Sequence, residues 1–592
     1  MDAWSVLAGS PLFARLSPET LGELAAHAEF VHVPSGRTLI EQGAAPDSMY
    51  IVVTGRLRAI LPGGQVAGDI GQRELLGEIG VISGEPRVAA VYAVRDSVVL
   101  RLMREALLSV LERNPAAMIE ITRVIIGRLR QNQRVQRLAA VRSVRTFAVV
   151  PATADADAAM VAAGLRDALS VYCAPRLIDA PLVDSELGPG SARTSEADAG
   201  AHGRMVEYLS RIESEHQHLI YLAGSDADAW SRRCMRQADR ILLVVGQRST
   251  PLASAMVEEL RTSGTRAPVD VVMVRPPGTP AAGAIGWRAM AGSGAHYYVR
   301  PNQPSDFAAL ARSLTGRAIG LVLGGGGARG FAHIGLMRAL RELNLPIDVI
   351  GGSSMGAFFS GLIACGYDHH EMAHLARETF VANNYLNDYL FPSIALIRGR
   401  KIVRRLHDIF DERQIEDLRM PYFCVSTNLT RGTPMVHDRG PLYMWVATSM
   451  AVPGVAPPVV YKGELLADGA VINSLPTDVM QGLERGPIIA SDVSTEGGIS
   501  APGIEGPDPE GLLRWGSKGE RPGLFSIIFR TATLTSESGV AARAARADLY
   551  IRMPVIGIGL FDWKKMDEIV ERGYQVALEK LTPMREHLLK GG

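Results

Sequence analysis

The sequence predicts a multidomain chain in which a small β-roll comes first and two α/β domains follow. Short β-rich runs separated by turn signals occupy about residues 10–110, whereas apolar strands alternate with helical segments from about residue 145 onward. At 592 residues the chain is much longer than one hydrophobic core supports. We therefore predict domains at 1–140, 141–315 and 316–592, the last with a central sheet between helices.

Charge and cysteine content narrow the function classes. The 62 Lys and Arg residues balance the 62 Asp and Glu residues, so no net charge favours nucleic acid as a partner. The four cysteines lack the spacing of disulfides or of a metal site, which is typical of a reducing compartment. We predict no disulfide, no metal site and no nucleic-acid partner.

The sequence gives no sign of export. Its N-terminal segment lacks a basic region followed by an apolar stretch and a cleavage site. Residues 349–367 carry no formal charge over 19 residues, but the glycines and serines in their first half favour a buried strand, a sharp turn and a packed helix over a membrane span. We expect a cytoplasmic protein whose membrane contact would be peripheral, at the inner face.

The first region contains the runs SMYIVVTGRLRAIL and VAAVYAVRDSVVLRL, as in a small β-barrel or jelly roll. The next stretch, 115–145, predicts a long amphipathic helix, with apolar residues at helical spacing at Met118, Ile121, Ile125 and Leu129. We interpret its arginine-rich face as the solvated side of a packing or dimer helix, which leaves a homodimer open.

The middle region alternates strands such as RTFAVVPA, RILLVVG and VDVVMV with helical segments, which predicts a parallel α/β domain. Its first strand is followed by Pro151, Ala152 and Thr153, without the glycine, lysine and hydroxyl pattern of a phosphate-binding loop. We interpret the domain as a structural module.

A glycine-rich turn follows the first strand of the third region. Gly325, Gly327 and Gly330 match the G-x-G-x-x-G pattern of dinucleotide-binding folds, and Asp348 lies about where an acidic ribose ligand would fall. The next strand favours another interpretation, because it leads into GSSMG at 352–356, a G-x-S-x-G element between strand and helix. This element is typical of a nucleophile elbow, so the candidate nucleophile is Ser354, at a helix N-terminus.

The same two turns could supply an oxyanion hole. The helix dipole and the Met355 amide favour the negative charge that develops on attack. Backbone amides around Gly326 and Gly327 could approach that charge closely because no side chain intervenes. Arg329 is expected to orient the glycine loop, since a cation is otherwise disfavoured at the start of a helix.

A serine nucleophile needs a base, and the sequence offers three candidates. His333 falls on the helix after the glycine loop, which favours a hydrogen-bonded packing histidine, and His437 in MVHDRG is no better placed. Asp468 is the strongest candidate, because an apolar strand in GELLADGA delivers it into a glycine turn. An Asp-Gly pair alone, however, is usually only a hairpin signal.

The motifs GGGARG, GSSMG and DGA occur in an order and with spacings that resemble those of patatin-like phospholipases. The resemblance implies a patatin-like α/β hydrolase domain with a catalytic dyad of Ser354 and Asp468 and no third catalytic residue. It also implies an oxyanion loop that contains Gly325, Gly326, Gly327 and Arg329.

Longer segments resemble the neuropathy target esterase family, a lysophospholipase group. They include LTGRAIGLVLGGGGARGFAHIG, ATSMAVPGVAPPVVYKGELLADGAVINSLP and, in the middle region, WSRRCMRQADRILLVVG. This resemblance implies hydrolysis of carboxylic esters of lysophospholipids or phospholipids through an acyl-serine intermediate, without a catalytic cofactor.

In that family the esterase follows cyclic-nucleotide-binding domains, and the first region resembles one of them. Gly77, Glu78 and the run PRVAAV at 86–91 fit its phosphate-binding cassette. Glu78 would accept from the ribose 2′-hydroxyl, and Arg87 would pair with the cyclic phosphate. Val88 replaces the small or hydroxyl-bearing residue of many members. The sequence thus leaves open whether a cyclic nucleotide is a regulatory ligand or the domain is a scaffold.

The chain has one such domain and no N-terminal transmembrane segment, so it resembles the bacterial-type members more than the animal enzymes. Two segments could act as a lid over the lipid site: 385–399, which is rich in apolar residues, and 497–523, which is rich in glycine and proline. The alternatives are a core segment and a disordered loop.

Two other function classes compete with the esterase. One is a ligand-sensing regulator, and the other is a dinucleotide-dependent enzyme, which the serine turn disfavours. The strand TFAVV after the long helix argues against a DNA-binding sensor, because no helix-turn-helix follows. A fluorophosphonate probe separates these classes, since only the esterase should be labelled at Ser354.

Overall fold

A computed structural model describes the chain except residues 1, 11, 15, 64–65, 115–117, 119–143, 196–197, 248–249, 280–281, 384, 386, 392–393, 484, 495–505, 515–523 and 591–592. The contacts divide the chain into two compact units, Met1–Thr315 and Gly316–Gly592. Among the described helices, none combines the length and the apolar character that crossing a membrane requires.

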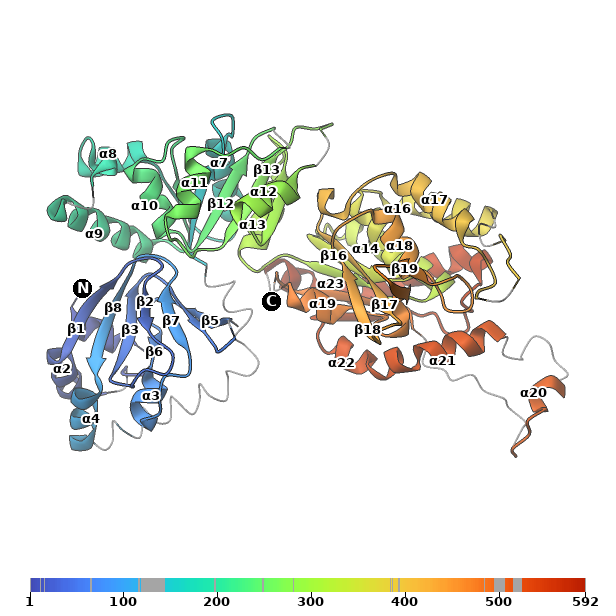
Figure 1. The fold of residues 1–592 in the computed structure, drawn as a ribbon, viewed down its shortest axis with the longest axis horizontal. Coiled ribbons are helices and arrows are strands. Elements are labelled where there is room, and N and C mark those ends of the chain that lie inside the picture. Colours follow the sequence, from blue (N-terminus) through green and yellow to red (C-terminus); the bar gives the residue numbers. More distant parts are fainter. Residues whose placement is uncertain are drawn as a thin grey trace. The chain divides into compact units, whose positions relative to one another are not determined.

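The first unit begins with a β-roll of two four-stranded antiparallel sheets, ordered β1-β8-β3-β6 and β2-β7-β4-β5 (Figure 1). Side chains alternate along β3 (Ser48–Thr54): Met49 and Ile51 join a core with the flanking helices, whereas Tyr50 and Val52 pack with the second sheet. The other elements are β1 (Ala28–Val33), β2 (Thr38–Ile40), β4 (Leu57–Ile60), β5 (Val66–Ile70), β6 (Leu75–Leu76), β7 (Ala90–Ala93), β8 (Ser97–Met103), α1 (Ala3–Ala8), α2 (Pro18–Ala26), α3 (Glu78–Ser83) and α4 (Arg104–Arg113).

Six parallel strands form a further sheet in the first unit, ordered β10-β11-β9-β12-β13-β14. Along β12 (Arg240–Val245), Ile241 and Leu243 pack with α10 (Ala229–Gln237), and Leu242 and Val244 with α7 (Ala158–Leu169). Helices on both faces explain why these strands are continuous apolar runs. The other elements are β9 (Thr146–Pro151), β10 (Arg176–Ile178), β11 (Leu219–Leu222), β13 (Val269–Val274), β14 (Ala295–Val299), α8 (Ala180–Leu187), α9 (Ala199–Glu215), α11 (Ala255–Thr262), α12 (Ala284–Ala291) and α13 (Pro304–Leu314).

A buried ionic cluster joins the β-roll to the parallel sheet. Asp239, just before β12, contacts Arg56 Nε at 3.0 Å and Arg95 Nε at 2.8 Å, and it accepts from the amides of Arg145 at 2.7 Å and Thr146 at 3.1 Å. The side chain of Arg56 is 3% exposed and that of Arg95 is 2% exposed. Burial alone would raise the pKa of Asp239, but the two arginines and the two amides lower it.

The second unit contains an eight-stranded mixed sheet (Figure 1). Strands β17, β16, β15, β21 and β22 are parallel, and β18, β20 and β19 lie antiparallel to their neighbours. The bounds are β15 (Gly320–Leu323), β16 (Val349–Ser353), β17 (Tyr422–Asn428), β18 (Thr433–His437), β19 (Val459–Tyr461), β20 (Glu464–Asp468), β21 (Ile488–Asp492) and β22 (Leu549–Arg552).

Helices cover both faces of this sheet. Leu321 and Leu323 of β15 pack with α14 (Ala332–Glu342), α15 (Met355–Ala364) and α23 (Met566–Lys590), whereas Val322 packs with Met480 of α19 (Thr477–Gly482). The remaining helices are η2 (Gly327–Phe331), α16 (His369–Ala376), η3 (Arg377–Ala382), α17 (Arg400–Phe410), η4 (Ile415–Asp417), α18 (Leu442–Ser449), η5 (Gly469–Val471), α20 (Gly511–Arg514), α21 (Leu524–Ser538), α22 (Val540–Ala544) and η6 (Trp563–Lys565).

The predicted fold class is confirmed: a β-roll, an α/β region with a parallel sheet, and a C-terminal α/β unit with its sheet between helices. The boundary predicted near residue 140 falls outside the described residues and stays a prediction. Nearly all of the helix predicted at 115–145, with its dimer face, and most of the segment at 497–523 also lie outside the described residues and stay predictions.

Candidate active site

Ser354 lies on a sharp turn between β16 and α15. Its backbone angles, φ 52° and ψ −122°, fall in a region that residues with a side chain rarely adopt. A Cβ at Gly356 would lie 2.0 Å from Leu323 O, and one at Gly352 would lie 2.5 Å from the carbonyl carbon of Gly356. Only glycine therefore fits at both flanking positions, which is how the sequence fixes this turn.

Asp468 lies at the end of β20, which pairs with β17 so that Asp468 is opposite Ser426. The Ser354 hydroxyl donates to Asp468 Oδ2 at 2.6 Å, and the Ala470 amide donates to Oδ1 at 2.8 Å. Burial raises the pKa of Asp468 to about 7, although these two hydrogen bonds act in the opposite direction. The structure thus brings together the two residues that the sequence suggested as nucleophile and base.

Ser449, the last residue of α18, supports the serine turn from behind. The Ser354 amide donates to Ser449 Oγ at 2.9 Å, and the Ser449 hydroxyl donates to Val425 O at 2.6 Å. The sequence did not identify this residue, because no local pattern distinguishes a supporting serine 95 residues from the one that it supports.

Three backbone amides of the glycine loop and of the residue after Ser354 have no hydrogen-bond partner in the described part of the chain: those of Gly326, Gly327 and Met355. Gly325 differs, because its amide donates to Ser474 O at 3.0 Å. Its lack of a side chain matters instead, since a Cβ there would lie 3.0 Å from Ser354 Cβ. Of the predicted oxyanion residues, Gly325 therefore contributes space, and the Arg329 amide donates to Gly326 O at 3.3 Å, whereas the amides of Gly326, Gly327 and Met355 are free to donate.

The glycine loop is tied to the segment before α23. Arg329 Nε donates to Ile558 O at 2.7 Å, and the Ala328 amide donates to Leu560 O at 2.8 Å. Gly327 has φ 57°, and a Cβ there would lie 2.4 Å from Leu560 O. Arg329 is thus placed where it can orient the loop, and its burial lowers the pKa of its guanidinium.

Neither histidine candidate contacts Ser354 through a ring nitrogen. His333 is fully buried, with Nε2 donating to Gly324 O at 2.9 Å and Nδ1 3.0 Å from Ser491 Oγ. His437 Nε2 lies 2.7 Å from Ser426 Oγ, and its ring stacks on Trp445. Burial lowers the pKa of both to about 4, so both rings are neutral at neutral pH.

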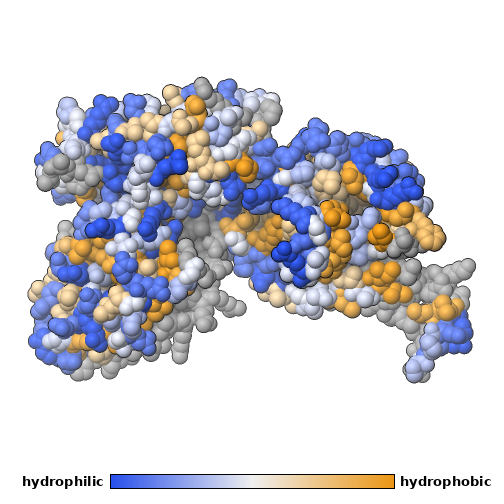
Figure 2. All heavy atoms as spheres, viewed as in Figure 1, coloured by the Kyte–Doolittle hydropathy of each residue, from blue (hydrophilic) through white to orange (hydrophobic). Residues whose placement is uncertain are grey.

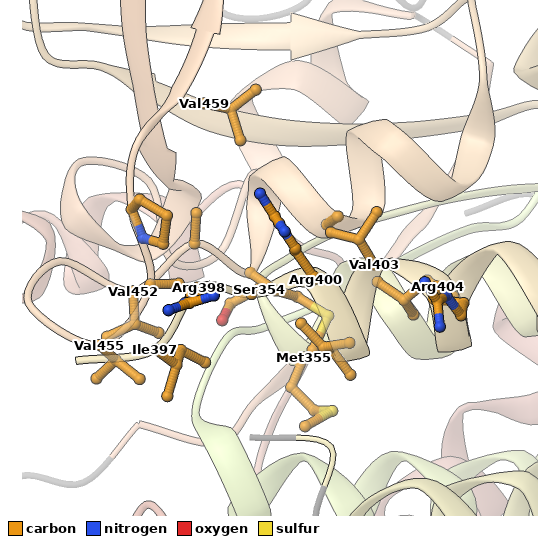
Figure 3. Close-up of a pocket in the computed structure, with 18 of the residues that line it drawn as sticks. Ser354, Met355, Ile397, Arg398, Arg400, Val403, Arg404, Val452, Val455 and Val459 are labelled. Atoms are coloured by element: carbon orange, nitrogen blue, oxygen red, sulfur yellow. The ribbon is translucent and has the colours of Figure 1, made fainter. Parts of the chain in front are cut away.

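Ser354, Met355 and Gly327 line a cavity of about 590 Å³ (Figure 3). Its other walls are mainly aliphatic and aromatic, and include Phe380, Ile397, Ile402, Val403, Met444, Val452, Val455, Val459, Leu560, Phe561 and Trp563. The guanidinium-bearing residues Arg398, Arg400 and Arg404 also line it. Such a cavity suits an apolar chain attached to a charged or polar group.

The segment predicted as a lid or core element, 385–399, forms part of this wall through Ile397, Arg398 and Gly399. Tyr389, Phe391 and Ile394 are exposed. The core alternative is therefore wrong for these three side chains.

Arg87, the predicted cyclic-phosphate ligand, is buried and bonded within its own domain. Its guanidinium donates to Gly77 O at 2.9 Å and to Ser48 O, and it lies 3.7 Å from Asp47. Glu78, the predicted ribose ligand, is partly buried in the first turn of α3, and Val88 is exposed. Arg87 thus stabilises the cassette itself, through the carbonyl of Gly77.

Three family models match the chain: patatin-like phospholipase over residues 321–480, cyclic nucleotide-binding domain over 30–114, and neuropathy target esterase family P-loop like domain over 143–287. An NTE family protein of Mycobacterium tuberculosis, named as uncharacterized, is 32% identical over 97% of this chain and 96% of its own. Patatin-like phospholipase domain-containing protein 6 of Homo sapiens is 28% identical over 95% of this chain and 45% of its own. Patatin-like phospholipase domain-containing protein 7 of Rattus norvegicus is 29% identical over 92% of this chain and 45% of its own.

The fold and the site at Ser354, taken with these matches, define the class as a lipid carboxylester hydrolase with a patatin-like domain and a cyclic-nucleotide-binding domain. The chain belongs to the neuropathy target esterase family, because a relative of that family is similar over almost its whole length. The predicted family resemblance and enzyme class are confirmed.

Proposed function

We propose that this chain hydrolyses lysophospholipids through a dyad of Ser354 and Asp468. The observation that carries the proposal is the 2.6 Å contact between the serine hydroxyl and a fully buried carboxylate, at the wall of an apolar cavity. Both histidine candidates are bonded elsewhere, which supports a dyad without a third residue.

The mechanism has two steps. In the first, Ser354 Oγ attacks the ester carbonyl while its proton passes to Asp468, and the amides of Gly326, Gly327 and Met355 stabilise the oxyanion. Collapse of the tetrahedral intermediate breaks the ester C–O bond, and the leaving alcohol takes the proton from Asp468. In the second step a water gives a proton to Asp468 and attacks the acyl-serine. Collapse of this second intermediate breaks the bond between the acyl carbon and Ser354 Oγ, the serine oxygen takes the proton from Asp468, and the fatty acid leaves. A carboxylate whose pKa is raised to about 7 is a better base than an ordinary one.

The cavity supports a single-chain phosphate ester as substrate. Its volume of about 590 Å³ and apolar walls suit an acyl chain, and the three arginines suit a phosphate, to which guanidinium binds in a forked geometry. A two-chain phospholipid would need room for a second chain, so we propose the lysophospholipid as the better substrate.

A lipid panel with one acyl chain throughout tests this proposal. Lysophosphatidylcholine, phosphatidylcholine and monoacylglycerol are compared by mass spectrometry of the released fatty acid. The lysophospholipid should give the highest kcat/KM. A preference for monoacylglycerol would contradict the phosphate assignment, and equal or faster cleavage of phosphatidylcholine would contradict the single-chain assignment.

Activity should depend on the ionisation of Asp468. Because the base must be deprotonated to accept the serine proton, and burial raises its pKa to about 7, kcat/KM should be constant above pH 7 and fall about tenfold per pH unit below it. The profile is measured with a neutral, soluble ester, so that substrate ionisation does not contribute. A profile that stays flat well below pH 6 would be inconsistent with Asp468 as the base.

We propose that the first domain is a scaffold and does not bind a cyclic nucleotide. A phosphate at Arg87 would compete with the two carbonyls that the guanidinium already binds, and the site is nearly closed, with Arg87 only 7% exposed. Calorimetry with cyclic AMP and cyclic GMP should therefore give no binding heat. Micromolar binding that Arg87→Ala abolishes would overturn this, since losing an arginine from a desolvated phosphate costs about 2–5 kcal/mol.

A further inference from the structure

Two antiparallel segments, 388–391 and 394–398, lie at the catalytic cavity, and we call the pair the hairpin. The Leu390 amide donates to Leu396 O at 2.7 Å, and the Arg398 amide donates to Asp388 O at 2.9 Å. The base of the hairpin is bonded to a neighbouring segment as well, because the amides of residues 396 and 397 donate to the carbonyls of residues 454 and 455, of which the second lies in the cavity wall. The hairpin is therefore held firmly at the cavity edge.

The exposed side chains of this hairpin are large and apolar. Tyr389 is 69% exposed, Phe391 86% and Ile394 69%. Phe561, which is 44% exposed, lies beside both the catalytic cavity and an adjoining hollow that Tyr389 also lines. We call these four residues the apolar rim. Exposed apolar residues that occur together, unlike scattered ones, mark an interaction surface.

Basic side chains lie next to the apolar rim. Within the described residues, Arg398, Arg400 and Arg404 have no ion pair and no side-chain hydrogen bond, although all three line the cavity (Figure 3). Helix α17, which carries two of them, has four basic residues, at 400, 401, 404 and 405, against one acid, Asp408.

Three acids of the neighbouring segments contact groups other than these arginines. Asp388 accepts from the Lys401 amide at 3.2 Å, Asp562 pairs with Lys565 at 2.9 Å, and Glu378 with Arg405 at 2.7 Å. On the face of the C-terminal unit seen in Figure 2, apolar residues, in orange, gather beside hydrophilic ones, in blue.

We propose that the apolar rim and the three arginines form a docking surface for a bilayer that contains anionic phospholipid. The apolar rim can enter the boundary between the headgroups and the acyl chains. The guanidinium groups can pair with the lipid phosphates of the headgroup layer. Four of its members, Arg398, Arg400, Arg404 and Phe561, line the catalytic cavity itself, so a docked enzyme receives its substrate directly from the bilayer. The proposal rests on the proposed function only in treating the cavity as a lipid site.

Charge complementarity selects this occupant over a second protein. An apolar protein partner would need no cluster of unpaired guanidinium groups, whereas each basic residue near an anionic membrane strengthens the attraction about fivefold. Removal of the apolar rim residues should weaken docking more than removal of any single charge, because burial of each large apolar side chain strengthens binding about ten- to a hundredfold.

Vesicle co-sedimentation of the full chain tests the proposal. The Ser354→Ala protein is used so that the lipid is not hydrolysed, with vesicles of phosphatidylcholine alone and of an equimolar mixture with phosphatidylglycerol. The protein should bind the mixed vesicles at least about tenfold more strongly, and high salt should remove most of that difference.

Three variants in this background locate the surface. The double change Phe391→Ser and Ile394→Ser should weaken binding to mixed vesicles about tenfold or more. Replacement of all three arginines by glutamine should abolish the preference for anionic lipid. Val171→Ser is the matched control, because Val171 is 78% exposed in the first unit, far from the cavity in sequence, and its loss should change nothing.

The outcomes separate this proposal from the proposed function. No vesicle binding, equal binding to both vesicle types, or full binding by the Phe391 and Ile394 variant would overturn the docking surface. Hydrolysis of a soluble ester by the wild-type chain is measured separately: hydrolysis without vesicle binding would refute docking alone. Vesicle binding without hydrolysis would support docking and refute the proposed function.

Discussion

Ser354→Ala and Asp468→Asn are each expected to lower kcat/KM for ester hydrolysis by about 10³-fold or more. Members of a nucleophile and base pair act as a unit, so removal of either one leaves only the binding and oxyanion contributions. In this chain the two side chains meet at 2.6 Å, and no other described base lies within hydrogen-bonding distance of Ser354 Oγ. The measurement is steady-state hydrolysis together with labelling of the serine by a fluorophosphonate.

Ser353→Ala provides the matched control. Ser353 is the adjacent residue, is fully buried, and its hydroxyl has no hydrogen-bond partner in the described part of the chain. Its loss should leave hydrolysis within about threefold of wild type, since no bonded group is removed. If Asp468→Asn kept near-normal turnover while His333→Asn lost it, the base would be the histidine and the dyad assignment would be wrong.

The Asp468→Asn variant should also remain folded. The raised pKa means that native protein holds a proton on Asp468 more tightly than unfolded protein does, so the stability contributed by this group falls as pH rises from 3.8 to about 7. At pH 8 the buried charge opposes folding, and asparagine removes it. Thermal unfolding at that pH should show a midpoint equal to or above that of wild type. A large decrease would indicate that lost activity reports misfolding.

The serine turn could be predicted from sequence because its chemistry is local. Glycines at 352 and 356 are required by contacts of their own turn, so the pattern itself carries the geometry. Asp468 is different, because its role depends on the pairing of β20 with β17, which brings it 114 residues along the chain to Ser354. The apolar strand and glycine turn made Asp468 the strongest candidate, but an Asp-Gly pair alone predicts a hairpin, so the dyad itself came from the family resemblance.

Other parts of the site had no readable signal. Ser449 reaches the serine turn through tertiary packing, and nothing in its own segment marks that contact. For Arg87 the motif left open a ligand contact or a scaffold, and the structure shows its guanidinium bonded to carbonyl groups of its own domain. The three arginines of the cavity wall were not singled out either, because whether an arginine pairs internally depends on acids from other segments. A sequence pattern thus indicates which polar and charged side chains a segment carries, whereas tertiary packing determines which partners they bind.

Asp239→Ala is expected to lower the free energy of unfolding of the first unit by about 3–5 kcal/mol, because it leaves Arg56 and Arg95 buried without their shared counter-charge. Two backbone amides, those of Arg145 and Thr146, lose their acceptor as well. The lowered pKa of Asp239 implies that its stabilisation is present above its ordinary pKa of 3.8 and is lost as pH falls through the folded value.

Denaturant unfolding of the full chain, followed by tryptophan fluorescence, measures this effect, since Trp230 and Trp287 are buried in the parallel-sheet core. The matched control is Asp167→Ala, which breaks an exposed pair with Arg166 and should cost less than about 1 kcal/mol. Asp239→Asn should lie between the two, because an amide retains one acceptor for the backbone but no charge for the arginines. Equal midpoints for Asp239→Ala and Asp167→Ala would show that the buried cluster contributes no more than a surface ion pair. The β-roll and the parallel sheet would then be held together mainly by their other contacts, which include the Arg95–Glu213 and Arg236–Asp96 ion pairs and the packing of Tyr92 and Val94 into the core of the sheet.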